Sequence, residues 1–398
     1  MIPKGFKVGG VCAGISNKKG KKDLSLFISQ TPAQSAAMFT SNIVKAAPVL
    51  IDIERLKKTN EISAIIANSG CANACTGKLG FQNALEMCEK VEKKFNLKKG
   101  SVLCASTGVI GQRINLSGLP KALNVLTDIA GTSAENEKDA VLGIMTTDTI
   151  IKKASRTIKI DGKNISIWGC AKGSGMIYPN LKTLHATMLS FILTDAFVEA
   201  ALLQKILSQS VEQSFNCVSV DGDTSTNDTV IALANGQSGK KITSGKNLDI
   251  FTKAFDDITL ELAKAMAKDG EGATKLIEVE VKNARNKNDA KSIASSIALS
   301  PLFKTAMFGA DANWGRIMSA AGKAGVDFNQ QKIDIYIGGL QTFKKGAPIK
   351  FSEKEAKKSL LKKEIKIVFN LNSGKASSKY YTCDLSYDYV KINGDYRS

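Results

Sequence analysis

Apolar residues recur every three or four positions in two long segments of the chain, 81–95 and 248–266. This spacing places them along one face of an α-helix. We therefore expect two amphipathic helices that pack against a core. The second helix is expected to end at Gly270, because glycine readily adopts the left-handed conformation that closes a helix.

Alternation of apolar and polar residues marks a second group of segments, 275–282, 332–339 and 364–372. This pattern predicts strands with one buried face. Two shorter apolar runs, 63–68 and 216–223, are also expected to be strands. Helices and strands alternate along the chain, which predicts an α+β or mixed α/β fold.

The composition indicates a soluble globular protein of two domains. Of the 398 residues, 43% are hydrophobic and 23% are charged, which is ordinary for a packed protein. Segments 235–247 and 281–289 are rich in small and polar residues, and either can form the boundary between domains. No apolar run approaches the roughly 20 residues of a membrane-spanning helix, and the start of the chain lacks the apolar core of a signal peptide. We expect a cytoplasmic protein.

Cysteine and histidine residues offer little support for a metal site. The eight cysteines are scattered without the density of a disulfide framework, so we expect them to be reduced. Cys71 and Cys75 are separated by three residues, and no second pair of this kind follows. His185 is the single histidine and cannot by itself complete a zinc site. We expect no bound metal.

The net charge of +18 raises a second possibility, a nucleic-acid-binding protein. Nearly all of the basic residues are lysines spread along the chain, and the lysine-rich runs contain few aromatic residues. Phosphate forks and base readout favour arginine, and base stacking requires aromatic side chains. These features favour a solvated lysine-rich face, and no nucleic acid or membrane partner is expected.

The stretch from Lys172 to Ala196 combines glycines, threonines and the single histidine with a strongly apolar end. A Ser-His-Asp triad is not expected, because His185 is only two residues from the candidate nucleophile, Thr187. A threonine can instead use its own α-amine as the base once the preceding peptide bond is cut. Thr187 suits this role because it follows the small Ala186 and precedes an apolar, strand-like run. A structural threonine at the start of a strand is the alternative.

A series of motifs gives a more specific indication. In order they are ANSGCANACTG, ASTGVIG, MTTDT, KGSGMIYPN, ATMLSFILTDA, VDGDTSTNDT, DGEGATK, GADANWGRI and INGDYRS. Together they resemble the signatures of the ornithine acetyltransferase (glutamate N-acetyltransferase) family, from one end of the chain to the other. The resemblance implies an acyltransferase of arginine biosynthesis. Such an enzyme moves an acetyl group from N2-acetyl-L-ornithine to L-glutamate in two steps, through an acetyl-threonine ester.

The same resemblance implies how the protein is built. Autocatalytic cleavage between Ala186 and Thr187 is expected to give an α chain, 1–186, and a β chain, 187–398, which stay associated as α2β2. The implied fold has layered sheets sandwiched by helices, DmpA/ArgJ-like, with a smaller C-terminal α/β domain from about residue 285. Two acyl transfers require no coenzyme, so no cofactor is expected, and acetyl-CoA stays open as a second acetyl donor.

Roles for individual residues follow from the matching motifs. Thr187 is implied to be the nucleophile, and Thr107 and Gly108 the oxyanion hole that meets the charge of the tetrahedral intermediate. The implied substrate-binding residues are Thr146, Lys172, Thr187, Glu271, Asn393 and Ser398. A lysine offers a cation for a carboxylate, whereas Glu271 can either hold the ornithine ammonium or relay a proton. Without the resemblance, a lone lysine or glutamate is usually a surface charge.

The chain departs from the family pattern just before the expected cut. It contains PNLKTLHAT where the family usually has P-N-x-A-T, an apparent insertion of four residues. Counting forward from PN selects Thr183 as the nucleophile, whereas counting back from the apolar strand selects Thr187. We prefer Thr187 because the strand that follows fixes its position, and a loop absorbs an insertion at modest entropic cost. His185 lies beside the cut and either assists cleavage or is a bystander.

Two points concern the tail and the reaction class. A strand is expected at 387–392, where YDYVKI alternates aromatic and apolar residues, and this strand would tie down the tail with Asn393 and Ser398. The alternative function is an aminopeptidase or amidase with a similarly generated nucleophile, in which water accepts the acyl group. KGSGMI, DGEGATK and NGDYRS favour the transferase, because a generic hydrolase does not explain them.

Overall fold

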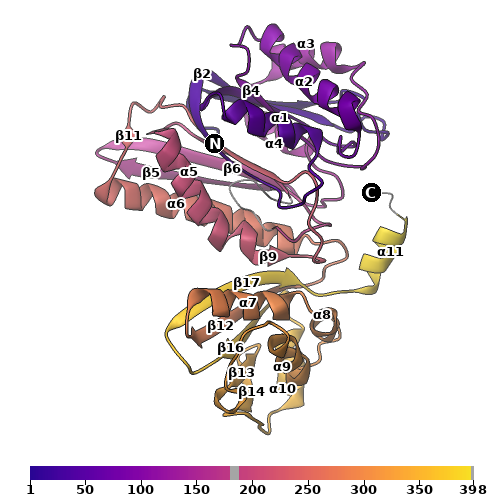
Figure 1. The fold of residues 1–398 in the computed structure, drawn as a ribbon, viewed down its shortest axis with the longest axis vertical. Helices are drawn as coiled ribbons and strands as arrows, with labels where there is room; N and C mark the ends of the chain where they lie inside the picture. The colour runs from indigo at the N-terminus through magenta and orange to yellow at the C-terminus, as the bar shows by residue number, and fades with distance from the viewer. Residues whose placement is uncertain (180–187, 396–398) are drawn as a thin grey trace. The chain divides into compact units, whose positions relative to one another are not determined.

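Two units, each with its own sheet, make up the part of the chain that the computed structural model describes, residues 1–179 and 188–395. Of the described residues, the first unit contains 1–216 and 223–263, and the second contains 217–222 and 264–395. Both units mix helices and strands (Figure 1). This arrangement confirms the predicted mixed α/β class.

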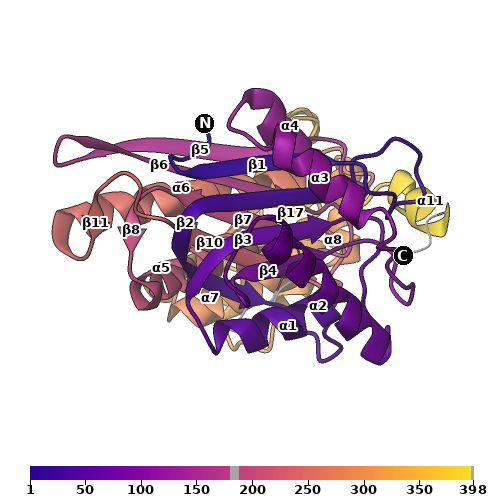
Figure 2. The same cartoon turned by 90° about the horizontal axis from the view of Figure 1, so that it is seen from above.

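The first unit is built on an eight-stranded sheet. Its strands, in spatial order, are β4 (Val102–Ser106), β3 (Glu61–Asn68), β2 (Leu24–Phe39), β10 (Thr229–Ala234), β7 (Leu189–Thr194), β6 (Lys163–Lys172) and β5 (Lys152–Ile160), with β1 (Phe6–Val11) paired to β2. Figure 2 shows the long strand β2 running across this sheet. β1 and β10 pair with successive parts of β2 on the side opposite β3.

The register of three neighbouring strands defines one edge of this sheet. Lys172, the last residue of β6, is paired with Leu189, the first residue of β7. Leu189 is paired in turn with Thr229, the first residue of β10. The end of β6 and the starts of β7 and β10 therefore lie level with one another. The core behind them includes Phe27 and Phe191, whose ring centroids are 4.9 Å apart.

Helices cover the sheet of the first unit. They are α1 (Ala47–Leu56), α2 (Gly77–Lys94), α3 (Leu119–Ile129), α4 (Ala134–Leu142), α5 (Ala200–Gln213) and α6 (Gly245–Lys268). α2 and α6 confirm the two amphipathic helices predicted from the apolar spacing. Short elements complete the unit: β8 (Phe197–Val198), β11 (Lys241–Ile242) and a 3-10 helix that runs into the second unit, Phe215–Cys217. Among the described residues, no helix is long and apolar enough to span a bilayer.

The second unit contains a seven-stranded sheet. Its strands, in spatial order, are β15 (Ala347–Pro348), β14 (Leu340–Lys344), β13 (Asp334–Ile337), β16 (Glu364–Asn370), β12 (Leu276–Ala284), β17 (Ala376–Cys383) and β9 (Val218–Ser219). Its helices are α7 (Lys287–Ala298), α8 (Pro301–Phe308), α9 (Trp314–Gly322), α10 (Glu353–Leu360) and α11 (Tyr387–Asp395), with a 3-10 turn at Gln330–Lys332. The strands expected at 275–282, 332–339 and 364–372 are thus confirmed as β12, β13 and β16. Of 216–223, only the two residues of β9 are strand.

The division between the units falls within α6, between Ala263 and Lys264. The boundary segments suggested by composition lie elsewhere, 235–247 in the first unit and 281–289 in the second. Their small and polar residues form turns between neighbouring elements, β10 to α6 and β12 to α7. The expected subdomain start near residue 285 lies inside the second unit, directly after β12. The division into α and β chains stays a prediction.

Gly270 does not close α6 in the way that we expected. The residue with positive φ is Gly272, at 69°. Gly270 is instead needed for space, because a Cβ there would lie 2.9 Å from Cys383 Sγ. Gly272 is constrained in both ways, since a Cβ on it would lie 2.5 Å from the Tyr389 backbone nitrogen. The glycines of DGEG therefore shape the loop that carries Glu271.

The strand expected at 387–392 is wrong, because this segment is the helix α11. Ser386 Oγ accepts a hydrogen bond from the Asp388 backbone N–H at 3.2 Å, which supports a helix start. Tyr387 and Val390 are three residues apart and share one face of the helix. Both are largely exposed, at 84% and 69%. The apolar residues of YDYVKI therefore fit a helix as well as a strand.

Candidate active site

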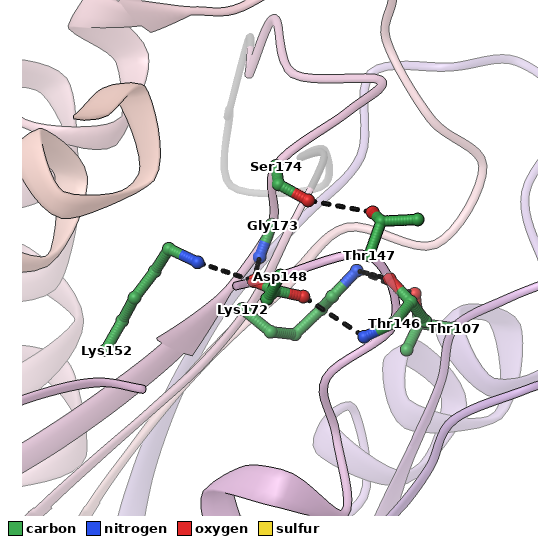
Figure 3. Close-up of polar contacts among 8 residues, drawn as sticks. All are labelled: Thr107, Thr146, Thr147, Asp148, Lys152, Lys172, Gly173 and Ser174. Atoms are coloured by element: carbon green, nitrogen blue, oxygen red, sulfur yellow. Dashed lines mark hydrogen bonds and ion pairs between the residues drawn. The ribbon is translucent and has the colours of Figure 1, made fainter. Parts of the chain in front are cut away.

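Lys172 is the centre of a buried polar cluster at the end of β6 (Figure 3). Its ammonium group donates hydrogen bonds to Thr146 Oγ1 at 2.9 Å and to Thr107 Oγ1 at 3.2 Å. The residue is 7% exposed, so these bonds are largely screened from water. The structure thus brings together three of the residues selected by motif, although they lie on three separate segments of the sequence.

Asp148 fixes the turn that carries Thr146. One carboxylate oxygen accepts hydrogen bonds from Lys152 Nζ at 2.6 Å and from the Gly173 N–H at 2.7 Å. The other accepts from the Thr146 N–H at 3.1 Å. The side chains of Asp148 and Lys152 are both fully buried. This arrangement joins the turn after α4 to the ends of β5 and β6.

The charge of Asp148 is set by two opposing influences. Burial by itself raises the pKa of a carboxyl group, but the ammonium groups of Lys172 and Lys152 and the Gly173 N–H lower it. The net result is a pKa of about 2. Asp148 is therefore ionised throughout the physiological pH range, and a fixed negative charge lies close to Lys172.

Thr107 and Gly108 form a tight turn directly after β4. The Thr107 N–H donates to Asn68 O at 3.0 Å. Gly108 has a φ of 132°, and a Cβ on it would lie 2.4 Å from the Gly70 carbonyl carbon. No residue with a side chain fits this position without moving the backbone of the 68–71 loop, so the glycine is required for both conformation and space.

This turn presents two hydrogen-bond donors. Within residues 1–179 and 188–395, the Gly108 N–H has no hydrogen-bond acceptor. Thr107 Oγ1 accepts a hydrogen bond from Lys172, which leaves its own proton free to be donated elsewhere. A hydroxyl and a backbone N–H on adjacent residues are a suitable pair for the oxygen of a tetrahedral intermediate. The geometry is compatible with the oxyanion hole implied by the motif.

The loop around Cys71 packs against the turn formed by Thr107 and Gly108. The backbone of Cys71 forms isolated β-bridges with Thr107 and Val109. Its thiol donates a hydrogen bond to Gln112 O at 3.3 Å. Burial raises the pKa of this thiol. Cys71 is free, as are the other seven cysteines. The ANSGCANACTG motif therefore has a structural part in the site, and the thiol is buried and bonded to the backbone.

Several of the predicted residues lie outside the described part of the chain. They are Thr183, His185, Ala186, Thr187 and Ser398. The described chain resumes at Met188, directly before β7, and Met188 O accepts a hydrogen bond from the Thr229 N–H at 2.5 Å. The residue that follows Thr187 in the sequence is therefore placed at the same edge of the sheet as Lys172.

Glu271 and Asn393 form a separate pair in the second unit. Asn393 Nδ2 donates to Glu271 Oε2 at 2.9 Å and also to Tyr389 O at 3.0 Å. Glu271 is half-buried and Asn393 is exposed. The structure thus brings these two predicted residues together within their own unit, on α11 and the Gly-rich loop before β12.

Comparison with known proteins identifies the family. The family model of the ArgJ family matches residues 7–398. The arginine biosynthesis bifunctional protein ArgJ of Caldanaerobacter subterraneus subsp. tengcongensis is 48% identical, over 100% of this chain and 98% of its own. The protein of the same name from Bacillus subtilis is 42% identical, over 100% of this chain and 96% of its own. The chain belongs to the ArgJ family. This membership confirms the resemblance that the motifs indicated.

A solved ArgJ structure supports the fold. The crystal structure of the arginine biosynthesis bifunctional protein ArgJ from Bacillus halodurans matches with 46% identity and a TM-score of 0.51. The match covers 98% of that solved chain but 52% of this one. The solved chain thus corresponds to about half of the present chain, whereas the curated ArgJ relatives correspond to its whole length.

Sequence reasoning missed two members of this ArgJ site, Asp148 and Lys152. Asp148 is the one charged residue of the MTTDT motif, and Lys152 follows it by four positions. The signal in the sequence is a lone carboxylate among threonines, followed by a lysine at the start of a strand. Lysine at a strand start is usually solvated, so the sequence alone gives no reason to expect it to be fully buried.

Proposed function

We propose that this chain transfers an acetyl group from N2-acetyl-L-ornithine to L-glutamate in arginine biosynthesis. The observation that carries the proposal is the hydrogen-bonded set of buried Lys172 with half-buried Thr146 and Thr107, at the sheet edge where β7 begins. Beside it is the Gly108 N–H, which has no acceptor among the residues that the structure describes. This set offers oxyanion stabilisation for acyl transfer. Membership of a family whose relatives are named for arginine biosynthesis supports the choice of substrates.

The first half-reaction begins at Thr187. Its α-amine, freed by cleavage, takes the hydroxyl proton while the oxygen attacks the acetyl carbonyl carbon of N2-acetylornithine. The negative charge that develops on the carbonyl oxygen is met by the Thr107 hydroxyl and the Gly108 N–H. Collapse of the intermediate breaks the carbon–nitrogen bond. The proton passes from the α-amine to the leaving nitrogen, and an acetyl-Thr187 ester remains.

The second half-reaction reverses these steps with glutamate. Its amine attacks the ester carbonyl, the same two donors hold the oxyanion, and Thr187 leaves with its proton restored by its α-amine. Thr146 and Lys172 are proposed to bind the substrates, and Lys172 supplies positive charge for a carboxylate. Glu271, Asn393 and Ser398 are also proposed to bind the substrates. The kinetics are then ping-pong, and no metal or coenzyme is required.

Self-cleavage at Ala186–Thr187 is part of this proposal. The cut would leave residues 187–398 as one chain, which is 212 of 398 residues, or 53% of the sequence. The 52% of this chain that is matched by the solved Bacillus halodurans chain is close to this value and supports a cut near the middle. We propose that both chains stay associated as α2β2 in the cytoplasm.

A second acetyl donor is a natural extension. The relatives carry the word bifunctional in their names, and the same ester can be formed from any acyl donor with a good leaving group. We propose acetyl-CoA as that donor, which would make the enzyme a glutamate N-acetyltransferase from either source. Transfer from acetyl-CoA is tested with the same acceptor, glutamate, in the absence of N2-acetylornithine.

The test combines intact mass with kinetics. Purified protein should consist of two chains separated before Thr187, and initial rates with both substrates should give parallel double-reciprocal lines. Thr187→Ala should abolish both cleavage and turnover, because the same hydroxyl serves both. A new N-terminus at Thr183 would move the cut and keep the mechanism. A single uncut chain with full activity, or release of acetate in place of N-acetylglutamate, would refute the proposal.

A further inference from the structure

Asp228 is a buried carboxyl group that the steps above do not use. It precedes the first residue of β10 and is 2% exposed. Its Oδ2 has no hydrogen-bond partner among the residues that the structure describes. Leaving a buried polar oxygen without a hydrogen bond is unfavourable, because the oxygen has lost its contacts with water. Such a group in a folded protein calls for an explanation of what it does.

The register of the sheet places Asp228 at the active-site edge. Thr229, the next residue, is paired with Leu189 of β7, which is paired with Lys172 of β6. The Thr229 N–H also donates to Met188 O at 2.5 Å. Asp228 therefore lies level with Met188, the residue that follows the proposed nucleophile in the sequence.

The preceding residue, Asn227, fixes this strand end to the oxyanion turn. Asn227 Nδ2 donates to Ser106 O at 2.8 Å and to Ala72 O at 2.5 Å. Ser106 is directly followed by Thr107. The position of Asp228 is thus coupled to that of the oxyanion donors through one amide group. Two hydrogen bonds from the Asn227 side chain and one from the Thr229 N–H therefore fix the backbone on both sides of Asp228.

Two influences determine how firmly Asp228 holds a proton. Burial raises the pKa of the carboxyl well above its ordinary value, and the positive charge of Lys172 opposes this rise. Lys172 is the one charged group in the described chain that acts on this carboxyl from the elements around it. Burial therefore favours the neutral carboxyl, whereas the neighbouring ammonium group of Lys172 stabilises the ionised form.

The proposed reaction has a proton that its steps do not yet account for. Ornithine leaves the tetrahedral intermediate as a neutral amine and must gain a proton to become the ammonium ion found in water. Glutamate arrives as an ammonium ion and must lose a proton before its nitrogen can attack. The glutamate ammonium group gives up one proton in the second half-reaction, and the ornithine amine takes up one proton in the first. One group that holds a proton between the two steps balances both.

We propose that Asp228 holds this proton. In the first half-reaction its O–H protonates the departing amine, and the carboxylate that remains is stabilised by Lys172. In the second, this carboxylate takes a proton from the arriving ammonium group and is restored to the neutral acid. Thr187 keeps its separate role, since its α-amine carries only the proton of its own hydroxyl. The inference rests on the proposed function, which defines the two half-reactions.

Asp195 provides a matched control on the same sheet. It is also buried, at 5% exposed, and burial also raises its pKa. It lies just beyond the other end of β7, about 20 Å from Leu189 at roughly 3.3 Å per residue. Its oxygens accept hydrogen bonds from the Ser166 and Lys4 N–H groups. Asp195→Asn therefore tests the cost of removing a buried carboxyl away from the site.

The experiment measures the second half-reaction by itself. Wild-type, Asp228→Asn and Asp195→Asn enzymes are acetylated with N2-acetylornithine and freed of ornithine. Each is then mixed with glutamate or with hydroxylamine from pH 6 to pH 9. Hydroxylamine is largely unprotonated at neutral pH and needs no base. For Asp228→Asn we expect transfer to glutamate at pH 7 to fall roughly 10²–10⁴-fold, the usual contribution of general base catalysis.

Two readouts separate proton transfer from a structural role. With glutamate, the rate constant of Asp228→Asn should rise about tenfold per pH unit, because only acceptor already deprotonated in solution can attack. With hydroxylamine, the variant should stay within a few-fold of wild type. Asp195→Asn should match wild type with both acceptors. An Asp228→Asn enzyme that keeps the wild-type rate with glutamate, or that loses equal activity with both acceptors at every pH, would overturn the inference.

A second variant keeps the test decisive if Asp228→Asn does not fold or is not processed. Asp228→Glu retains the carboxyl, so it should retain a wild-type-like pH response with glutamate at a reduced rate. Equal loss of transfer to both acceptors in Asp228→Glu would again overturn the inference. If wild-type enzyme itself forms no acetylated chain, it is the proposed function that fails. The two failures are therefore distinguishable.

Discussion

The two groups of candidate residues differ in how firmly the fold holds them. In the first unit, Lys172 donates hydrogen bonds to both Thr107 and Thr146, and the fully buried side chain of Asp148 accepts from the Thr146 N–H. In the second unit, Asn393 lies on a helix with no buried residue, where a single hydrogen bond connects it to Glu271. The cluster around Lys172 is therefore preorganised, whereas Asn393 and Glu271 are held by few contacts.

This difference suggests a division of labour. Preorganised donors in a buried site act on charge that develops during the reaction, so their loss reduces kcat. An exposed polar pair with few hydrogen bonds is better suited to bind the substrate in its ground state, so the loss of such a pair raises KM. The following changes test this division, beginning with the largest expected effect.

Replacing Lys172 should be the most damaging change. Lys172→Met removes the ammonium group that donates to both Thr107 and Thr146. Each hydrogen bond to a charged group contributes about 1.5–3 kcal/mol, so kcat/KM should fall roughly 10²–10⁴-fold in steady-state assays. Lys153→Met is the control, since that ammonium is 38% exposed and pairs with Glu137. A Lys172→Met enzyme as active as this control would remove Lys172 from the site.

Removing the Thr107 hydroxyl should affect the chemical step alone. Thr107→Ala is expected to lower kcat roughly 10²–10³-fold, the usual loss for one oxyanion donor. KM for N2-acetylornithine should change little, because the oxyanion exists only after attack. Thr107→Ser retains the hydroxyl and should stay near wild type. If Thr107→Ala instead raises KM and leaves kcat unchanged, the hydroxyl is a ground-state contact.

The buried cluster should also give the protein a specific sensitivity to acid. Asp148 has its pKa lowered from 3.8 to about 2, so its charge stabilises the folded state above pH 4 and this contribution is lost as the pH falls toward 2. A shift of this size corresponds to about 2 kcal/mol in the free energy of unfolding. Urea titrations between pH 5 and pH 2 should show the difference in stability between wild type and Asp148→Asn shrink by about this amount. A constant difference would show that Asp148 is not held ionised by its partners.

The pair in the second unit should give the smallest effect. Asn393→Ala removes the amide that contacts Glu271, and the loss of one hydrogen bond to a charged group should raise KM for at least one substrate about tenfold. kcat should change much less. Asn247→Ala is a matched control, because that exposed amide also donates to a carboxylate, Asp161. A large fall in kcat for Asn393→Ala would contradict the division of labour.

Periodicity predicted the long elements and failed at the tail. α2, α6 and β12 each have enough apolar positions to distinguish a period of 3.6 from a period of 2. In 387–392 the apolar residues are too few for this distinction. Ser386, whose hydroxyl accepts from the Asp388 N–H, lies just outside the pattern that we considered. Local capping therefore decided a segment that alternation alone could not.

The site was predictable only where a motif named its residues. Lys172 lies 65 positions from Thr107 and 26 positions from Thr146 in the sequence. No spacing rule connects residues so far apart. Asp148 lies in MTTDT and Asp228 in VDGDTSTNDT, but neither motif by itself indicates a role for its aspartate. What distinguishes them is complete burial beside Lys172, and burial of an isolated aspartate follows from tertiary packing rather than from its neighbours in the sequence.

The central claim is that Thr187 becomes the first residue of a chain and carries the acetyl group. The most direct measurement is to incubate the enzyme with N2-acetylornithine alone, quench in acid, and locate the acetyl group by tandem mass spectrometry. We predict one acetyl group per C-terminal chain, on the side-chain oxygen of an N-terminal Thr187, removable by hydroxylamine as an ester. Two unmodified chains, or one uncut chain, from enzyme that still transfers acetyl to glutamate at full rate would contradict the account.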